Sequence, residues 1–341
     1  MPEQRFLVVR LGSLGDIVHT FPAVAGLRES YPNAEIAWLT HPRWKSLVES
    51  SGLATDIWQT ETRSYRSLRE IIGRIRKKQF TAAIDYQGLW KSAGLPFLGR
   101  VSRRIGFSSQ TIREFGVPIL YTDRVRCTRT HIAEQNGELS QRAGARNGGA
   151  PVVLAVPSIQ EAFVLQLLRG FAIERYIVLS PGGGWRSKCW LPDRYGTLCQ
   201  RIHRELGLRC VLNYAFGEEQ LVSAIKAASG EADPIAYNGS LDQLMALLRN
   251  AVCIVGGDTG PLHLAVAVGA SAVAIFGPTD PARNGPYRTG DRSRTSPCDI
   301  VLRSPRAVTT YKRSDQPAPS ILEITVDEVF EAVRRLIEVR R

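Results

Sequence analysis

The sequence lacks the features of a membrane-spanning, secreted or metal-caged protein. No apolar run approaches the roughly 20 residues that a membrane-spanning helix needs. The opening "MPEQRFLVVR" has no apolar signal-peptide core before a small-residue cleavage site, so we expect a cytoplasmic protein. The six cysteines are scattered and form no CxxC pair. This pattern fits neither a zinc site nor a disulfide framework, and it predicts reduced, packed thiols.

Acidic residues are too few to balance the basic ones. The chain has 32 Asp and Glu against 44 Lys and Arg, which gives a net charge of +12. Such a surplus indicates an anionic partner: nucleic acid, an acidic membrane surface or an acidic substrate. Because the sequence has no RNA-recognition, zinc-finger or basic-zipper pattern, we expect no nucleic-acid partner.

Strand and helix signals alternate through both halves of the 341 residues. In the first half, the strands and helices are expected at 5–11, 16–31, 34–40, 43–50, 80–88 and 89–99. In the second half, they are expected at 175–184, 193–206, 208–217, 218–229, 241–251, 253–258, 259–269, 271–278 and 326–341. Apolar strands separated by helices predict an α/β protein with two doubly wound parallel sheets.

A stretch rich in Gly, Ala and Pro separates the two halves. It reads "AGARNGGAPVVLAVPS" and predicts a domain boundary near residues 145 to 160. We therefore expect one domain over 1–155 and a second over 156–325. Ligands of such sheets bind at the carboxyl ends of the strands, which we expect to line a cleft between the domains.

The loop "RLGSLGDIVHT" follows the first strand and has two glycines but not the G-x-G-x-x-G spacing of a dinucleotide site. An acid, Asp16, follows the second glycine, Gly15, at once and would repel a phosphate. One interpretation is that Asp16 only caps the helix, since Asp is a favoured N-cap residue. The other is that Asp16 is a general base, kept ionised by the helix N-terminus, while the glycines let a substrate approach.

A second motif, "CIVGGDTGPLHLAVAVG", places a strand end before a helix N-terminus. Free amides there, with the Thr259 hydroxyl beside Gly260 and Pro261, suit a diphosphate. Asp258 at the strand end is a candidate acceptor of hydrogen bonds from sugar hydroxyls. His263, about one turn into the helix, either reaches a phosphate or merely packs.

Two further segments of the second half carry weaker signals. In "SPGGGWRSKCWLP", the three glycines Gly182, Gly183 and Gly184 let the backbone approach a ligand. Lys188 is either a solvated loop lysine or a charge that stabilises a departing diphosphate. Glu218, just after a strand, either holds ribose hydroxyls or is an ordinary acid in a first helical turn.

The first half also carries many basic residues, most of which a solvated surface would explain. Four of them follow strands, in loops or at helix starts: Arg63, Arg66, Lys91 and Arg113. These side chains are candidates for a basic rim that binds an acidic acceptor.

Taken together and in order, these motifs resemble the glycosyltransferase family 9 heptosyltransferases. "GSLGDIVHTFPA" is similar to the family's S-x-x-G-D-x-x-H-T-x-P segment, and "IDYQGLWKSA" to its D-x-Q-G-L-x-K-S-A segment. "QTIRE" resembles the acceptor-side Q-T-x-R-E, and "GGDTGPLHLAVAVGASAVAIFGPTDP" the donor motif. The resemblance covers nearly the whole chain. It implies a GT-B fold of two Rossmann-like domains, with the last helix, 326–341, packing back on the N-terminal domain.

The resemblance also implies a reaction. The donor would be ADP-L-glycero-D-manno-heptose, bound by the C-terminal domain, and the acceptor a Kdo-containing lipid A at the cytoplasmic face of the inner membrane. Transfer would invert the anomeric centre, with no catalytic metal and no cofactor. The roles carried over are a base at Asp16, leaving-group stabilisation at Lys188, sugar contact at Asp258, ribose contact at Glu218, diphosphate contacts at Thr259, Gly260 and His263, and acceptor contacts at Arg63, Arg66, Lys91 and Arg113.

The sequence departs from the heptosyltransferase I branch in the donor loop. That branch has a threonine pair where this chain has Gly183 and Gly184, and its proline after Trp190 is displaced by one residue here. Two alternatives therefore stay open: a family 9 transferase with another nucleotide sugar or acceptor, and a noncatalytic protein that binds nucleotides or polyanions.

Overall fold

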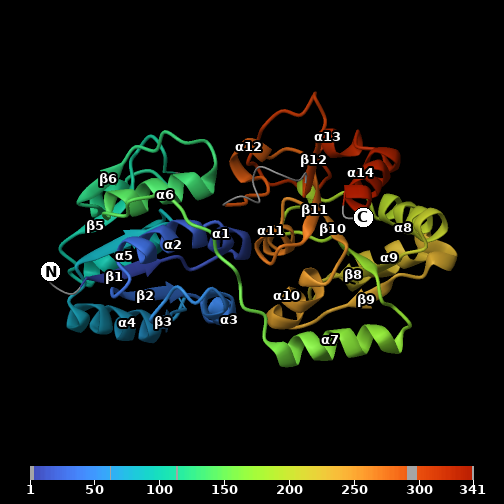
Figure 1. Ribbon diagram of the computed structural model, residues 1–341. Helices are drawn as coiled ribbons and strands as arrows, with labels where there is room; N and C mark the ends of the chain where they lie inside the picture. The colour runs from blue at the N-terminus through green and yellow to red at the C-terminus, as the bar shows by residue number, and fades with distance from the viewer. Residues whose placement is uncertain (1–3, 62, 113, 290–297, 340–341) are drawn as a thin grey trace. The chain divides into compact units, whose positions relative to one another are not determined.

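The computed structural model describes residues 4–61, 63–112, 114–289 and 298–339. The chain divides into two compact units, Met1–Ala155 and Val156–Arg341. Each unit has its own six-stranded sheet flanked by helices (Figure 1). All the paired strands run parallel, which confirms the α/β, doubly wound fold class.

The N-terminal sheet has the strand order β3-β2-β1-β4-β5-β6. Its strands are β1 (Arg5–Val9), β2 (Glu35–Thr40), β3 (Asp56–Gln59), β4 (Ala82–Asp85), β5 (Arg104–Phe107) and β6 (Asp123–Val125). The helices of this unit are α1 (Leu14–Val18), α2 (Phe21–Ser30), η1 (Pro42–Trp44), α3 (Lys45–Ser50), α4 (Tyr65–Lys78), α5 (Trp90–Leu98), η2 (Val117–Leu120) and α6 (Ile132–Arg142). The apolar β1 pairs with β2 and β4, and this register sets Val9 beside Asp85 at the carboxyl edge.

The single helix expected at 16–31 is two helices in the structure. α1 ends at Val18 and α2 begins at Phe21, with Pro22 in the first turn of α2. Proline has no N–H to donate to the carbonyl four residues earlier, and its ring clashes with that carbonyl. A continuous helix through Pro22 is therefore disfavoured, and the chain restarts the helix with proline at a position that tolerates it.

The C-terminal sheet has the order β12-β11-β10-β7-β8-β9. Its strands are β7 (Tyr176–Ser180), β8 (Arg209–Asn213), β9 (Ile235–Tyr237), β10 (Cys253–Gly257), β11 (Ser271–Phe276) and β12 (Asp299–Arg303). The helices of this unit are α7 (Ser158–Gly170), η3 (Arg186–Lys188), α8 (Pro192–Leu206), α9 (Glu219–Ser229), η4 (Gly230–Ala232), α10 (Leu241–Arg249), α11 (Gly260–Ala267), α12 (Pro281–Asn284), α13 (Pro319–Leu322) and α14 (Val326–Val339).

The last helix packs within the C-terminal unit. Helix α14 packs on α8 and on strands β10 to β12 of the C-terminal unit. Its apolar residues Val329, Val333 and Leu336 belong to the same buried core as Trp190. The Arg201 guanidinium also lies 4.0 Å from the centre of the Phe330 ring. The strongly amphipathic α14 buries its apolar stripe against the sheet of its own unit.

The structure also bears on the features that the sequence lacks. Among the described residues, no helix combines the length and the apolar character that crossing a membrane would require. All six cysteines are free thiols, and Cys199, Cys210 and Cys253 are buried in the C-terminal core.

Candidate active site

The loop after β1 presents the Asp16 carboxylate on the surface of the N-terminal unit. Asp16 is the third residue of α1, and Ser13 is the N-cap, so the expectation that Asp16 itself is the N-cap was wrong by three residues. Asp16 still caps the helix, because its Oδ2 accepts hydrogen bonds from the Ser13 backbone N–H at 3.1 Å and from Ser13 Oγ at 2.9 Å. This is the carboxylate half of a capping box. Gly15 is buried within the same turn.

A buried arginine, which the sequence interpretation missed, holds the other oxygen of Asp16. Arg10 Nη2 lies 2.7 Å from Asp16 Oδ1, and the Arg10 side chain is 6% exposed where that of Asp16 is 45% exposed. The opposite charge favours the ionised carboxylate. The buried Arg10 therefore orients the Asp16 carboxylate, while the Asp16 side chain stays partly exposed to solvent.

Asp85, at the carboxyl end of β4, is a second polar residue that the sequence interpretation passed over. This buried carboxylate accepts hydrogen bonds from the backbone N–H groups of Gln87 (2.9 Å) and Gly88 (3.2 Å). It also accepts from Ser92 Oγ (2.9 Å) and Tyr121 Oη (2.7 Å). Burial raises the pKa of Asp85 above its ordinary value, although these hydrogen bonds act in the opposite direction.

The turn organised by Asp85 supports the Asp16 loop. The carbonyl of Tyr86 accepts a hydrogen bond from Arg10 Nη1. The side-chain oxygen of Gln87 accepts from the Leu11 N–H at 2.8 Å. Asp85 therefore supports Asp16 indirectly: it holds the turn whose Tyr86 carbonyl binds Arg10, and Arg10 pairs with Asp16. An acid directly after the apolar run "FTAAID" is the signal by which it could have been found.

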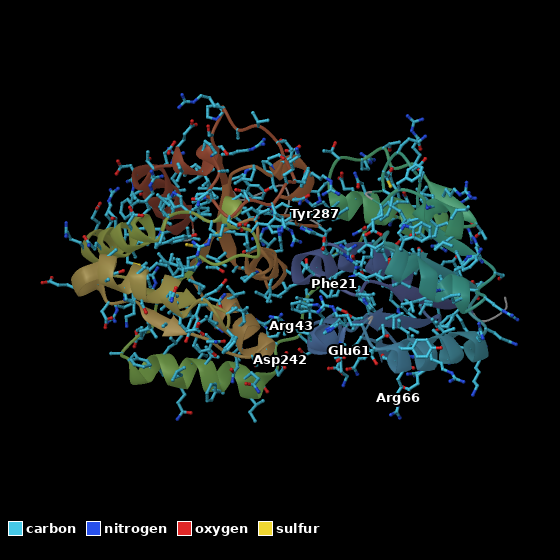
Figure 2. The ribbon with its side chains drawn as sticks, turned by 180° about the vertical axis from the view of Figure 1, so that it is seen from behind. Phe21, Arg43, Glu61, Arg66, Asp242 and Tyr287 are labelled. Atoms are coloured by element: carbon cyan, nitrogen blue, oxygen red, sulfur yellow. The ribbon has the colours of Figure 1, made fainter. Side chains whose placement is uncertain are left out.

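The basic residues expected at an acceptor site lie on the surface of the N-terminal unit. Arg63 and Lys91 are exposed. Arg66 projects outward from α4 (Figure 2), is 90% exposed, and places Nε 3.0 Å from Glu70 Oε1 one turn along the helix. Arg113 lies outside the described residues. An exposed pair of this kind contributes little to stability, so Arg66 can exchange Glu70 for another anion at small cost.

In the C-terminal unit, the partly exposed Lys188 and the buried Asp258 and His263 form a trio at the carboxyl end of β10. Lys188 Nζ lies 2.6 Å from Asp258 Oδ2, and His263 Nε2 lies 3.1 Å from Asp258 Oδ1. Burial by itself raises the pKa of Asp258, but the His263 hydrogen bond and the Lys188 charge outweigh it. Together they hold the pKa of Asp258 well below its ordinary value.

This arrangement changes the picture of Asp258 as a free acceptor for sugar hydroxyls. Each of its carboxylate oxygens already has a protein partner. The carboxylate therefore orients the ammonium of Lys188 and the imidazole of His263. The Trp185 ring, whose centre is 4.4 Å from Lys188 Nζ, further confines the cation.

The start of α11 meets the glycine loop beside this trio. Thr259 is the N-cap, and Gly260 and Pro261 open the helix. Thr259 Oγ1 is buried and has no hydrogen-bond partner among the described residues. A Cβ on Gly183 would lie 3.0 Å from Thr259 Cγ2, so the glycine permits this close approach. A buried hydroxyl at a helix N-terminus, where the first amides lack intrahelical acceptors, is suited to an anionic ligand.

Glu218 lies against the same glycine loop. Its Oε2 accepts a hydrogen bond from the Ala215 N–H at 2.8 Å, and Glu218 is the N-cap of α9. A Cβ on Gly182 would lie 2.1 Å from Glu218 Oε1, so a larger residue there would displace the Glu218 carboxylate. Gly184 has open space around it. The neighbouring Phe216 is almost fully exposed and offers an aromatic face that the sequence interpretation missed.

The comparison with known protein families decides the class of the chain. Residues 68–297 match the model of glycosyltransferase family 9 (heptosyltransferase). The chain belongs to this family. It is therefore a glycosyltransferase, and both the family resemblance and the GT-B fold expected from the sequence are confirmed.

Individual relatives of this family 9 enzyme are distant. Lipopolysaccharide core heptosyltransferase OpsX of Haemophilus influenzae is 23% identical over 287 residues, covering 83% of this chain and 82% of OpsX. Lipopolysaccharide heptosyltransferase 1 of Escherichia coli K12 is 25% identical over 324 residues, covering 89% and 94%. The solved structure of E. coli heptosyltransferase WaaC with ADP superimposes with a TM-score of 0.76 at 21% identity, covering 98% of this chain and 100% of that one.

Proposed function

We propose that this enzyme transfers heptose from ADP-L-glycero-D-manno-heptose to a Kdo-containing lipid A acceptor in lipopolysaccharide core synthesis, with inversion. One observation carries the proposal: the Lys188–Asp258–His263 trio stands beside the unpartnered Thr259 hydroxyl at the N-terminus of α11. The names of the relatives support the same donor and acceptor classes, since they are lipopolysaccharide heptosyltransferases, one of them solved with ADP.

The C-terminal residues would bind the donor and stabilise its leaving group. The amides that open α11 and the Thr259 hydroxyl bind the diphosphate, and Glu218 accepts hydrogen bonds from the ribose. As the bond between the anomeric carbon and the phosphate oxygen breaks, its electron pair leaves with ADP. Lys188 then stabilises the growing negative charge. Asp258 keeps the ammonium in place, so no reorganisation is needed at the moment of reaction.

Asp16 would act on the acceptor. Its partly exposed carboxylate accepts the proton of the attacking hydroxyl while the new carbon–oxygen bond forms on the face opposite the leaving ADP. Arg10 and Ser13 hold the carboxylate in one orientation. This reaction needs neither a nucleophilic side chain nor a second carboxylic acid, which agrees with the residues present.

The basic surface would recognise the acceptor. Lys91, Arg63 and Arg66 are exposed cations that suit the carboxylates and phosphates of a Kdo-containing lipid A. Arg113 stays a candidate from the sequence. Because such an acceptor is a membrane lipid, we place the enzyme at the cytoplasmic face of the inner membrane in peripheral contact.

The test is an assay of ADP release with ADP-heptose and Kdo-lipid A. Turnover with this pair, and its loss in Asp16→Asn, is the expected result. A wild-type enzyme that releases no ADP from this pair contradicts the proposal.

The glycine form of the donor loop supports a second candidate, a family 9 transferase with another nucleotide sugar. Gly183 and Gly184 offer only backbone amides where side-chain hydroxyls would select among sugars. Ranking ADP, UDP, GDP and their sugars by the rise in melting temperature separates the two. Strongest stabilisation by a uridine or guanosine ligand favours the second candidate.

A further inference from the structure

The segment between β12 and α13, residues 304–318, lies against the short helix that carries Lys188. We call it the crossing segment. Both backbone groups of Ser187, the residue before Lys188, bond to it. The Ser187 N–H donates to the Ser314 carbonyl, and the Ala318 N–H donates to the Ser187 carbonyl, each at 3.3 Å. The crossing segment therefore helps to fix the backbone from which the Lys188 side chain projects.

The same segment reaches the next loop of the sheet. The Thr310 N–H donates to the Pro278 carbonyl at 2.7 Å, just after β11. The Arg283 guanidinium of α12 lies 5.6 Å from the centre of the Tyr311 ring. The crossing segment thus runs along the carboxyl edge of the C-terminal sheet, where ligands of such sheets bind. It follows residues 68–297, which match the family model, so the family match itself assigns it no role.

Arg313 of the crossing segment meets the tryptophan that confines Lys188. The Arg313 guanidinium carbon lies 5.3 Å from the centre of the Trp185 ring, and Lys188 Nζ lies 4.4 Å from the same centre. The two cations are therefore within about 10 Å of each other, about one screening length in ordinary salt, so their charges repel. Trp185 comes two residues after Gly183, which lies against Thr259 at the N-terminus of α11. The pair of cations thus lies beside the anion site proposed above.

The two positive charges differ in how they are balanced. Asp258 pairs with Lys188, whose side chain is 14% exposed. Arg313 is exposed and forms no ion pair with any residue that the structure describes, Asp315 of its own segment included. Lys188, Asp258 and Arg313 together therefore carry one net positive charge. Such a surplus at the edge of a ligand site favours an anionic ligand.

We propose that Arg313 binds the diphosphate of the nucleotide sugar, as a second cation of the donor site beside Lys188. A guanidinium offers two parallel N–H groups that match two phosphate oxygens, and it stays charged at any physiological pH. Contact with the Trp185 ring restricts the long side chain, so less freedom is lost on binding. Because Asp258 holds Lys188 and no described acid holds Arg313, Arg313 contributes affinity for the donor while Lys188 acts on the departing charge. The inference rests on the proposed function only in requiring a nucleoside diphosphate sugar as the donor.

Isothermal titration of the full chain with ADP, and with adenosine, which lacks the diphosphate, tests this role. In Arg313→Gln the Kd for ADP should rise about tenfold, because a charged hydrogen-bond donor to the phosphates is lost, while the Kd for adenosine stays unchanged. Arg313→Lys keeps the charge and loses the planar fork, so its Kd for ADP should rise less. The matched control is Arg306→Gln. Arg306 is an exposed arginine of the same segment that pairs with Glu323 at 3.2 Å, and its variant should bind ADP as the wild type does.

Three results would overturn the proposal. They are an unchanged Kd for ADP in Arg313→Gln, an equal loss of affinity for ADP and adenosine, and a wild-type enzyme that binds no nucleoside diphosphate. The second would mean that Arg313 only supports Trp185. UDP and GDP are titrated in parallel, since all three nucleotides share the diphosphate. A wild type that prefers UDP or GDP contradicts ADP-heptose as the donor, and Arg313 is then judged by the rise or constancy of the Kd for that nucleotide.

Discussion

Each candidate site places a carboxylate after a strand of its own sheet, but the two carboxylates differ in their surroundings. Asp16 lies in the first turn of α1, is 45% exposed, and has its two oxygens paired with the buried Arg10 and with Ser13. Asp258 lies just after β10, is buried, and has both oxygens occupied by Lys188 and His263. An open carboxylate can exchange a proton with a substrate. A buried carboxylate acts through the side chains that it orients.

The sharpest test of this contrast is Asp16→Asn, which keeps the shape and removes the base. We expect kcat to fall by about 10²–10⁴-fold, the usual contribution of a general base. The matched control is Asp56→Asn, an exposed carboxylate of the same unit that also pairs with an arginine, Arg74, at 2.7 Å. The rate of ADP release gives kcat for both variants. Full turnover in Asp16→Asn would show that Asp16 is not the general base.

The second test is Asp258→Asn, for which the main readout is stability. Removing one partner of a buried pair costs about 3–5 kcal/mol, because the Lys188 charge is left uncompensated. Since the pKa of Asp258 is lowered in the folded protein, its contribution is present above the pKa of about 4 of an unfolded Asp and is lost as the pH falls below it.

The gap in melting temperature between wild type and Asp258→Asn should therefore be wide at pH 7 and narrow below pH 4. As a control, Asp327→Asn removes the carboxylate of a surface pair with Arg201, and its effect should be under about 1 kcal/mol. A gap that does not change with pH would contradict the charge argument.

The third test is Lys188→Met, which keeps most of the length of the side chain and removes the charge. We expect kcat to fall by about 10²–10³-fold, the scale of one lost transition-state donor. Lys226→Met, which removes a surface partner of Asp233 in the same unit, is the matched control and should retain full turnover. Equal turnover by the two variants would mean that Lys188 supports the fold and does not stabilise the leaving group.

The smallest expected effect concerns the support beneath Asp16. Tyr121→Phe removes the hydroxyl that donates to Asp85 at 2.7 Å, which should cost about 1–3 kcal/mol of stability and lower kcat severalfold. Tyr176→Phe removes another buried tyrosine hydrogen bond, to the Leu247 carbonyl, in the other unit. It should cost similar stability and leave kcat unchanged. An equal kcat for the two variants would reduce Asp85 to a purely structural residue.

Much of the fold could be predicted from the sequence because the central strands are long and apolar. β1, β7, β10 and β11 are buried along their whole lengths or nearly so, and each was expected within a few residues of where it lies. Short, half-exposed edge strands such as β3 and β6 carry too little apolar signal to be expected. Pro22 breaks the helix that the apolar pattern of 16–31 predicts, so two helices form there.

The candidate site was predictable residue by residue but not as a set of contacts. Asp16, Lys188, Asp258 and Thr259 all stand out by their place after strands or glycines. Lys188 and Asp258 are 70 positions apart in the sequence. They pair because the sheet brings β7 beside β10. Arg10 was hidden because a basic residue at the end of an apolar run usually reaches solvent.

The sequence alone was enough for the long apolar strands, the glycines that allow close approach, and the family. Local propensity and motif spacing carry that information along the chain. Only the tertiary structure decided the surroundings of each charge: the buried Arg10 behind Asp16, the closed trio around Asp258, and the α14 stripe on the C-terminal sheet. Burial and pairing depend on distant segments meeting, and they decide whether a carboxylate exchanges protons or orients a cation.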